Sequence, residues 1–186
     1  MNKFFIPAIA ALGIATPAFA NGPSVEAQLG YDSIGVQGAS GSISGVSYGG
    51  TLAYEMDVDR SIFLGAELSV DNNAVKECAG SSTVADPRVC VNFGREFGAA
   101  LRGGVHVGEN DDLYATVGYT NLRSTGSEFD GTTLSKGSAN LNGIRVGAGY
   151  RHWFGARTYG KIEYRYSNYE QGIIRHQGLI GVGYQF

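Results

Sequence analysis

The sequence ends with GLIGVGYQF, residues 178–186, in which apolar side chains alternate with small or polar ones. One face of this stretch carries Ile180, Val182, Tyr184 and Phe186. The opposite face carries Leu179, Gly181, Gly183 and Gln185. A period of two is typical of a β-strand whose two faces meet different surroundings. A water-soluble protein rarely leaves such an apolar strand uncovered, so the stretch raises the question of what covers it.

The same alternation recurs through the rest of the chain, and helical periodicity does not. Eight runs show it, at residues 24–33, 45–58, 60–71, 92–107, 112–122, 144–154, 159–167 and 175–186. In the fourth run the pattern places Phe93 and Phe97 on the apolar face, with Glu96 opposite. The sequence therefore predicts eight strands.

The connections between these runs alternate in length. Those after the second, fourth and sixth runs are short, at residues 58–60, 108–111 and 155–157. Those after the first, third and fifth are long and rich in small polar residues, around 34–44, 72–91 and 124–138. Outer-membrane barrels sort their connections in this way, with short periplasmic turns and long extracellular loops.

The apolar faces are expected to point into lipid. Eight faces of large apolar side chains would overfill the interior of an eight-stranded barrel. The other faces combine glycine with scattered charged residues, which fit a narrow polar lumen. Closing the sheet pairs every backbone N–H and C=O, as hydrocarbon requires. The expected fold is all-β: an eight-stranded, antiparallel, up-and-down transmembrane β-barrel.

The first twenty residues have a different character. Lys3 precedes an apolar run from Phe4 to Ala15, and Ala18-Phe19-Ala20 follows. This order is typical of a secretory signal peptide, so we expect a signal peptide at 1–20 and the barrel domain at 21–186. The expected location is the outer membrane of a Gram-negative bacterium, after export to the periplasm.

The two cysteines, Cys78 and Cys90, lie close together in the long connection after the third run. In an oxidising compartment this spacing predicts a disulfide, with two free thiols as the alternative. No metal-ligand spacing surrounds them, and we expect no metal or cofactor.

The net charge of −3, without a basic patch, indicates no nucleic-acid partner.

The final strand resembles the C-terminal assembly signal of bacterial outer-membrane barrels, through Phe186 at the end and Tyr184 two residues before it. The resemblance implies recognition by the barrel-assembly machinery. The whole pattern is similar to the small eight-stranded family of the OmpA transmembrane domain, OmpX and opacity-like surface proteins. Leu179 departs from the polar residue often found early in the signal.

Charged residues on the polar faces are expected to form a paired network in the lumen, because unpaired buried charges are very costly. Its expected members are Glu55, Glu67, Glu96, Arg102, Arg145, Arg151, Lys161, Glu163 and Arg165. Heights counted from the short turns predict that Glu67 pairs with Arg102 and that Glu163 lies near Arg145. Such a network would plug the lumen. A narrow, gated channel for small solutes or ions is the alternative.

Some small outer-membrane barrels are enzymes that act on lipids, and they need a nucleophile beside a base at the outer rim. His176 is the candidate base, with Ser167 or Ser124 as conceivable partners. No compact Ser/His motif supports this alternative, so no catalytic residue is predicted.

The sequence therefore predicts a monomeric, non-enzymatic surface protein whose rigid barrel presents extracellular loops and supports envelope integrity. Its expected partners are outer-membrane lipids and lipopolysaccharide, with an extracellular ligand bound through the loops.

Overall fold

The computed structural model describes residues 22–38, 41–74, 76–81, 83 and 85–186. The predicted signal peptide at 1–20 lies outside the described residues. The strands are β1 (Pro23–Val36), β2 (Ser42–Asp59), β3 (Ile62–Asn73), β4 (Lys76–Ala79), β5 (Arg88–His106), β6 (Asp111–Phe129), β7 (Leu134–Trp153), β8 (Thr158–Tyr169) and β9 (Ile173–Gln185). A short 3-10 turn, η1 (Glu170–Gly172), joins β8 to β9.

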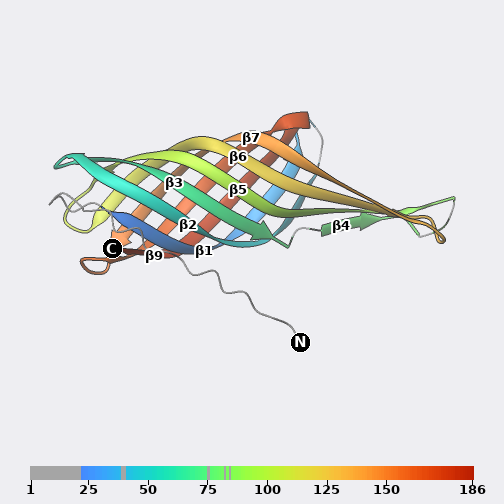
Figure 1. The fold of residues 1–186 in the computed structure, drawn as a ribbon, viewed down its shortest axis with the longest axis horizontal. Coiled ribbons are helices and arrows are strands. Elements are labelled where there is room, and N and C mark those ends of the chain that lie inside the picture. Colours follow the sequence, from blue (N-terminus) through green and yellow to red (C-terminus); the bar gives the residue numbers. More distant parts are fainter. Residues whose placement is uncertain (1–21, 39–40, 75, 82, 84) are drawn as a thin grey trace.

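Eight of these strands close into a barrel, which Figure 1 shows side-on. Each of the eight strands pairs antiparallel with the strands beside it in the ring, and the short β4 pairs antiparallel with β5 at the edge. The first and last strands pair from Ser24–Gln185 to Val36–Ile173, and β3 pairs directly with β5. The ring is therefore closed, as the eight alternating runs predicted, and its backbone groups are paired without an open edge.

The two faces of the sheet have opposite character. Large apolar side chains lie outside, where Leu101 is 66% exposed and Leu29 is 57% exposed. Charged side chains lie inside, and Arg102 is 1% exposed. A water-soluble barrel would show the reverse arrangement, so the exposure pattern indicates a protein whose outer wall faces lipid.

The strands β5, β6 and β7 continue well past the barrel rim at the end opposite the C-terminus (Figure 1). The outer parts of β5, β6 and β7, with β4 at one edge, form what we call the projecting sheet, residues 76–79, 88–92, 124–129 and 134–140. The pairing of β6 with β7 runs without interruption to Phe129 and Leu134.

The projecting sheet corrects the sequence interpretation of residues 124–138 as a long loop. Only residues 130–133 connect β6 to β7. The stretch is rich in serine and glycine and lacks apolar alternation, because neither of its faces meets lipid. Backbone hydrogen bonds continue the ladder there without the side-chain pattern that identified the membrane-spanning part.

A β-bulge in β5 corrects the predicted position of Phe93. The register with β6 shifts between Phe93 and Glu96, so the two flanking side chains both point inward. Phe93 is buried inside the barrel, whereas the sequence placed it on the apolar outer face. The extra residue lies at Gly94 and Arg95, and an added residue of this kind reverses which positions face inward beyond it.

Candidate functional site: the lumen and the projecting sheet

Ionised side chains fill the lumen. Among the described residues, six buried side chains are cationic: Arg102, Arg145, Arg151, Lys161, Arg165 and Arg175. Eight are acidic: Glu26, Asp32, Glu55, Glu67, Asp71, Glu96, Asp112 and Glu163. Every expected member of the network has its side chain here. The surplus of carboxylates is met by neutral donors such as Tyr114, Tyr159 and Trp153, whose O–H and N–H groups donate to Glu163, Glu26 and Asp112.

Arg102 connects three carboxylates from three strands. Its Nε donates to Glu67 Oε2 at 2.9 Å, and its Nη1 donates to Glu55 at 2.8 Å and to Glu26 at 3.0 Å. The guanidinium also lies over the ring of Tyr114, 4.7 Å from its centre. The fixed fork of donors on arginine suits such a position, because it can satisfy several carboxylates at once. The expected contact between Glu67 and Arg102 is present.

Glu163 has different partners from those expected. It accepts hydrogen bonds from Arg165 Nε at 2.6 Å and from Lys161 Nζ at 3.0 Å, both on its own strand. Arg145 instead pairs with Glu96, which also pairs with Arg175. The predicted proximity of Glu163 and Arg145 is therefore wrong. Counting heights along two strands ignored their tilt, which displaces residues of equal count relative to one another.

Arg151 extends the network toward the end of the barrel that holds the C-terminus. Its Nη1 donates to Glu55 and its Nε donates to Asp112, each at 2.7 Å. His106 lies beside this group, with Nδ1 2.6 Å from Asp112 and Nε2 3.3 Å from Asp57.

Five members were not in the predicted network: Glu26, Asp32, Asp71, Asp112 and Arg175. All five lie on inward-facing positions of their strands, so the same period-two rule could have found them.

A second layer, made of apolar side chains, lies inside the barrel at the end opposite the C-terminus. We call it the apolar cap: Ile34, Phe93, Leu122, Leu141 and Tyr169, each at most 6% exposed. Ile43, Val91 and Ile173 pack against it. Sequence reasoning missed the cap because these residues occupy inward positions near strand ends, where only charged side chains had been sought. The bulge in β5 adds Phe93 to it.

The candidate catalytic pair is not assembled. His176 lies on the outer wall, where its Nδ1 is 2.6 Å from the hydroxyl of Tyr164. Its ring is tilted by 56° against the ring of Tyr166, and the two ring centres are 5.1 Å apart. Ser167 is fully buried on the inner side, and its Oγ accepts a hydrogen bond from Arg145. The sheet separates the histidine from this serine. The described residues also contain no group of three or more potential metal-ligating side chains.

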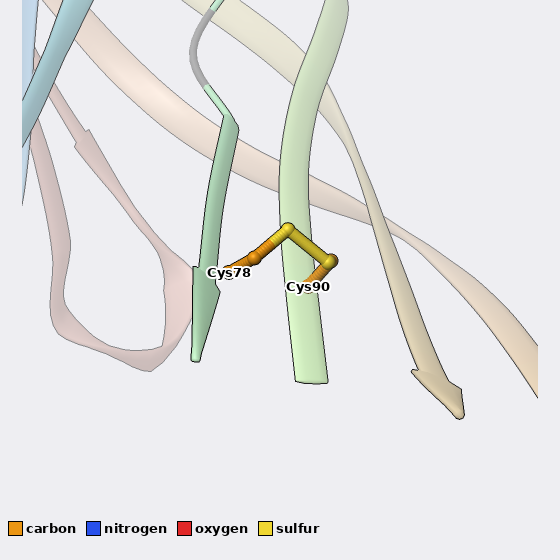
Figure 2. The surroundings of a disulfide bond; sticks show 2 residues. All are labelled: Cys78 and Cys90. Atoms are coloured by element: carbon orange, nitrogen blue, oxygen red, sulfur yellow. A yellow bond between two sulfur atoms is a disulfide. The ribbon is translucent and has the colours of Figure 1, made fainter. Parts of the chain in front are cut away.

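The disulfide between Cys78 and Cys90 joins β4 to β5 in the projecting sheet (Figure 2). The two cysteines are directly paired residues of the ladder, with their Cα atoms 4.1 Å apart. Since β4 has no other strand beside it, the bond fastens this edge strand to the sheet.

The terminal aromatics are placed at the end opposite the projecting sheet. Tyr184 and Phe186 are 40% and 69% exposed on the outer wall, and their rings meet edge to face at 5.3 Å. The backbone N–H of Phe186 donates to Pro23 at 3.0 Å, which fixes the last residue against the first strand.

The profile of the outer membrane protein beta-barrel domain matches residues 6–186. The chain belongs to this family. As a member, it is an outer-membrane protein of a Gram-negative bacterium, and its polar-in, apolar-out wall is the arrangement such a location requires. The short turns and the C-terminus lie at one end of the barrel, and the projecting sheet lies at the other. In outer-membrane barrels the short turns face the periplasm and the long connections face outward.

Solved outer-membrane proteins share this fold. The attachment invasion locus protein Ail of Yersinia pestis is 14% identical, with a TM-score of 0.61 over 89% of this chain and 99% of that one. Neisserial surface protein A is 16% identical, with a TM-score of 0.57 over 88% and 97%. The N-terminal barrel of Pseudomonas aeruginosa OprF is 17% identical, with a TM-score of 0.50 over 89% and 99%.

No curated protein sequence matches the chain. Within the described residues, no helix has the length and apolar character to cross a membrane.

Proposed function

We propose that this outer-membrane barrel is a monomeric, non-enzymatic surface protein that presents its projecting sheet to a ligand outside the cell and contributes to envelope integrity. The observation that carries the proposal is the unbroken pairing of β6 with β7 beyond the rim, to Phe129 and Leu134. A paired sheet holds its surface residues in fixed positions, which lowers the entropy lost when a ligand binds.

The lumen supports presentation over transport. Two successive layers fill it, the ionic network and the apolar cap above it. An eight-stranded barrel has an interior just wide enough for side chains, so both layers leave little room for solutes.

The projecting sheet offers a polar surface for contact. Its inner face, which continues the lumen wall, has a groove of about 430 Å³ with walls of small residues that include Ser124, Gly126, Ser135 and Gly137. A Cβ added at either glycine would meet no atom within 4 Å, so the surface there is open. Ail has been crystallised with the heparin analogue sucrose octasulfate. That finding concerns Ail, but it supports an extracellular ligand as the type of partner to seek.

The test removes the projecting hairpin and keeps the barrel. Replacing residues 126–137 with Asn-Gly joins the paired residues Thr125 and Ser138 by a two-residue turn. We expect this variant to insert normally, as judged by heat-modifiable migration on gels, and to lose adhesion of expressing cells to host-surface molecules. The full-length variant Thr132→Ala is the control and should adhere like the wild type.

Two results would overturn the proposal. Adhesion by the shortened variant equal to that of the wild type would exclude the projecting sheet as the binding surface. Steady, large openings in planar-bilayer recordings of the purified protein would contradict the closed lumen and favour the channel alternative.

A further inference from the structure

Two arginines break the apolar outer wall at one height. Arg95 lies at the bulge of β5, and Arg123 lies opposite it on β6, where the Arg123 carbonyl is 3.7 Å from a Cβ built on Gly94. Both side chains are exposed. The carboxylates among the described side chains make no ion pair with either of them. Two cations placed together on a wall that otherwise excludes charge require an anion from outside the chain.

Their height matches a membrane surface. Arg95 lies eleven residue steps along β5 from His106 at the periplasmic end, and Arg123 lies eleven steps along β6 from Asp112. At about 3.3 Å per residue and a strand tilt of about 40°, both arginines lie roughly 28 Å above that end. The hydrocarbon core is about 30 Å thick. The arginines therefore lie at the boundary between the outer-leaflet acyl chains and their headgroups.

A groove on the outer wall begins at Arg95. It has a volume of about 760 Å³, and its lining includes Tyr48, Asn72, Leu29 and Ile180. These four residues and Arg95 lie on five consecutive strands, β9, β1, β2, β3 and β5. Four strand spacings of about 4.8 Å give the groove a length of roughly 19 Å.

The groove descends from the headgroup boundary into the hydrocarbon. Its lower end, at Val182, is four residues from the C-terminus and therefore close to the periplasmic side. The lower wall has small residues, Ala27 and Gly50, opposite the larger Leu29 and Tyr48. In the same groove, Asn72 Nδ2 donates to the hydroxyl of Tyr48 at 3.2 Å. A long apolar groove with cations at its upper end is complementary to an acyl chain attached to a phosphorylated headgroup.

We propose that this groove and the arginine pair form a binding site for one phosphorylated glycolipid of the outer leaflet, with a phosphate on Arg95 and Arg123 and an acyl chain in the groove. Arginine suits this role because its planar fork of donors matches the oxygens of a phosphate. Phe97 lies beneath the Arg95 guanidinium, 4.5 Å from ring centre to Cζ, and holds it against the wall. The inference rests on the outer-membrane location and not on ligand presentation, so the two proposals can fail independently.

The test measures binding of bis-phosphorylated, hexa-acyl lipid A to the purified full-length mature chain by native mass spectrometry from detergent micelles. We expect the double variant Arg95→Gln/Arg123→Gln to weaken the apparent Kd by at least about tenfold, which is 1.4 kcal/mol. The matched control is Arg60→Gln, which removes an exposed arginine at a periplasmic turn and should leave the Kd unchanged.

Two further measurements distinguish the contribution of the groove from that of the arginines, and lipid A from another anionic lipid. Ala27→Leu adds bulk to the groove and keeps both charges, and it should weaken binding several-fold. Phosphatidylglycerol, an anionic lipid without the glucosamine phosphates, should bind more weakly and respond equally to Arg60→Gln and to the double variant. Heat-modifiable migration checks that every variant is folded.

The proposal fails if the double variant binds lipid A like the wild type, or if Arg60→Gln weakens binding as much as the double variant does. It also fails if phosphatidylglycerol binds as tightly as lipid A with the same dependence on Arg95 and Arg123, because the site would then select charge alone.

Discussion

Arg102 and Glu26 meet inside the lumen although two other strands of the ring separate β5 from β1. The guanidinium Nη1 lies 3.0 Å from the carboxylate Oε1, and both side chains are inaccessible to solvent. Glu26 is also paired with Lys161 on β8. These contacts join strands that no backbone ladder connects, so the ionic network braces the barrel from within.

Arg102→Ala would leave Glu26, Glu55 and Glu67 without their shared cation. We expect the free energy of unfolding, measured by urea titration in lipid vesicles, to fall by about 3–5 kcal/mol, because breaking a buried pair leaves charge uncompensated. Arg60→Ala, at an exposed turn, should change it by less than about 0.5 kcal/mol. Equal effects of the two substitutions would show that the lumen network does not stabilise the barrel.

Leu122 belongs to the apolar cap and is completely buried, whereas Leu101 faces lipid and is 66% exposed. Leu122→Ala should lower the free energy of unfolding by about 2–5 kcal/mol, since it leaves a cavity. Leu101→Ala removes the same atoms from a position where lipid can fill the space, so its effect should be clearly smaller. The same urea titration compares both variants, and the reverse order would contradict a packed cap.

The lipid-facing wall can be tested with charge. Val117 is 54% exposed at the middle of β6, and Leu134 is equally exposed at the outer end of β7. Val117→Arg should reduce stability by about 2–4 kcal/mol, because the charge would lie in hydrocarbon. Leu134→Arg should leave the stability nearly unchanged, since the projecting sheet lies in water. Similar values for the two variants would place the membrane elsewhere on the wall.

The Cys78–Cys90 bond should act locally. A disulfide that closes a loop of this length is expected to stabilise the folded state by about 3 kcal/mol, because it restricts the unfolded chain. Cys78→Ser/Cys90→Ser is expected to increase amide hydrogen exchange in β4 (Lys76–Ala79) and to leave exchange in the barrel strands unchanged. Faster exchange throughout β3 and β5 would mean that the bond supports the barrel itself.

Asp130 organises the four-residue connection at the tip of the projecting sheet. The backbone N–H groups of Thr133 and Thr132 donate to its carboxylate at 2.6 and 2.9 Å, and these bonds lower the pKa of Asp130. The contribution to turn stability is therefore present above the unfolded-state pKa, about 3.9. It is lost as the pH falls through the lower pKa of the folded turn. An NMR titration of the Asp130 carboxyl should show this lowered pKa, and Asp130→Ala should broaden the Thr132 and Thr133 amide signals.

The barrel could be predicted from sequence because period-two alternation is a property of each strand alone. Leu29 and Leu101 were placed correctly on the outer wall in this way, and Arg102 and Glu163 on the inner one. Partners across the lumen depend on how neighbouring strands are tilted and staggered, and no single strand encodes that. For this reason the Glu163–Arg145 pairing was wrong although both residues faced inward.

The projecting sheet escaped prediction for a related reason. A strand in water on both faces has no apolar stripe, so residues 124–138 were predicted to be a loop. The bulge in β5 could have been predicted from Gly94, because a glycine inside a strand pattern often marks such an irregularity.

The bulge also means that the number of residues in β5 decides which side of the sheet its outer side chains face. Losing one residue between Phe93 and Glu96 would restore strict alternation and turn every position from Arg88 to Phe93 to the opposite side of the sheet. Phe93 would leave the cap, and Cys90 would point away from Cys78. Single-residue insertions and deletions should therefore be tolerated better at residues 85–87, which belong to no strand, and selected against in the few positions around Gly94.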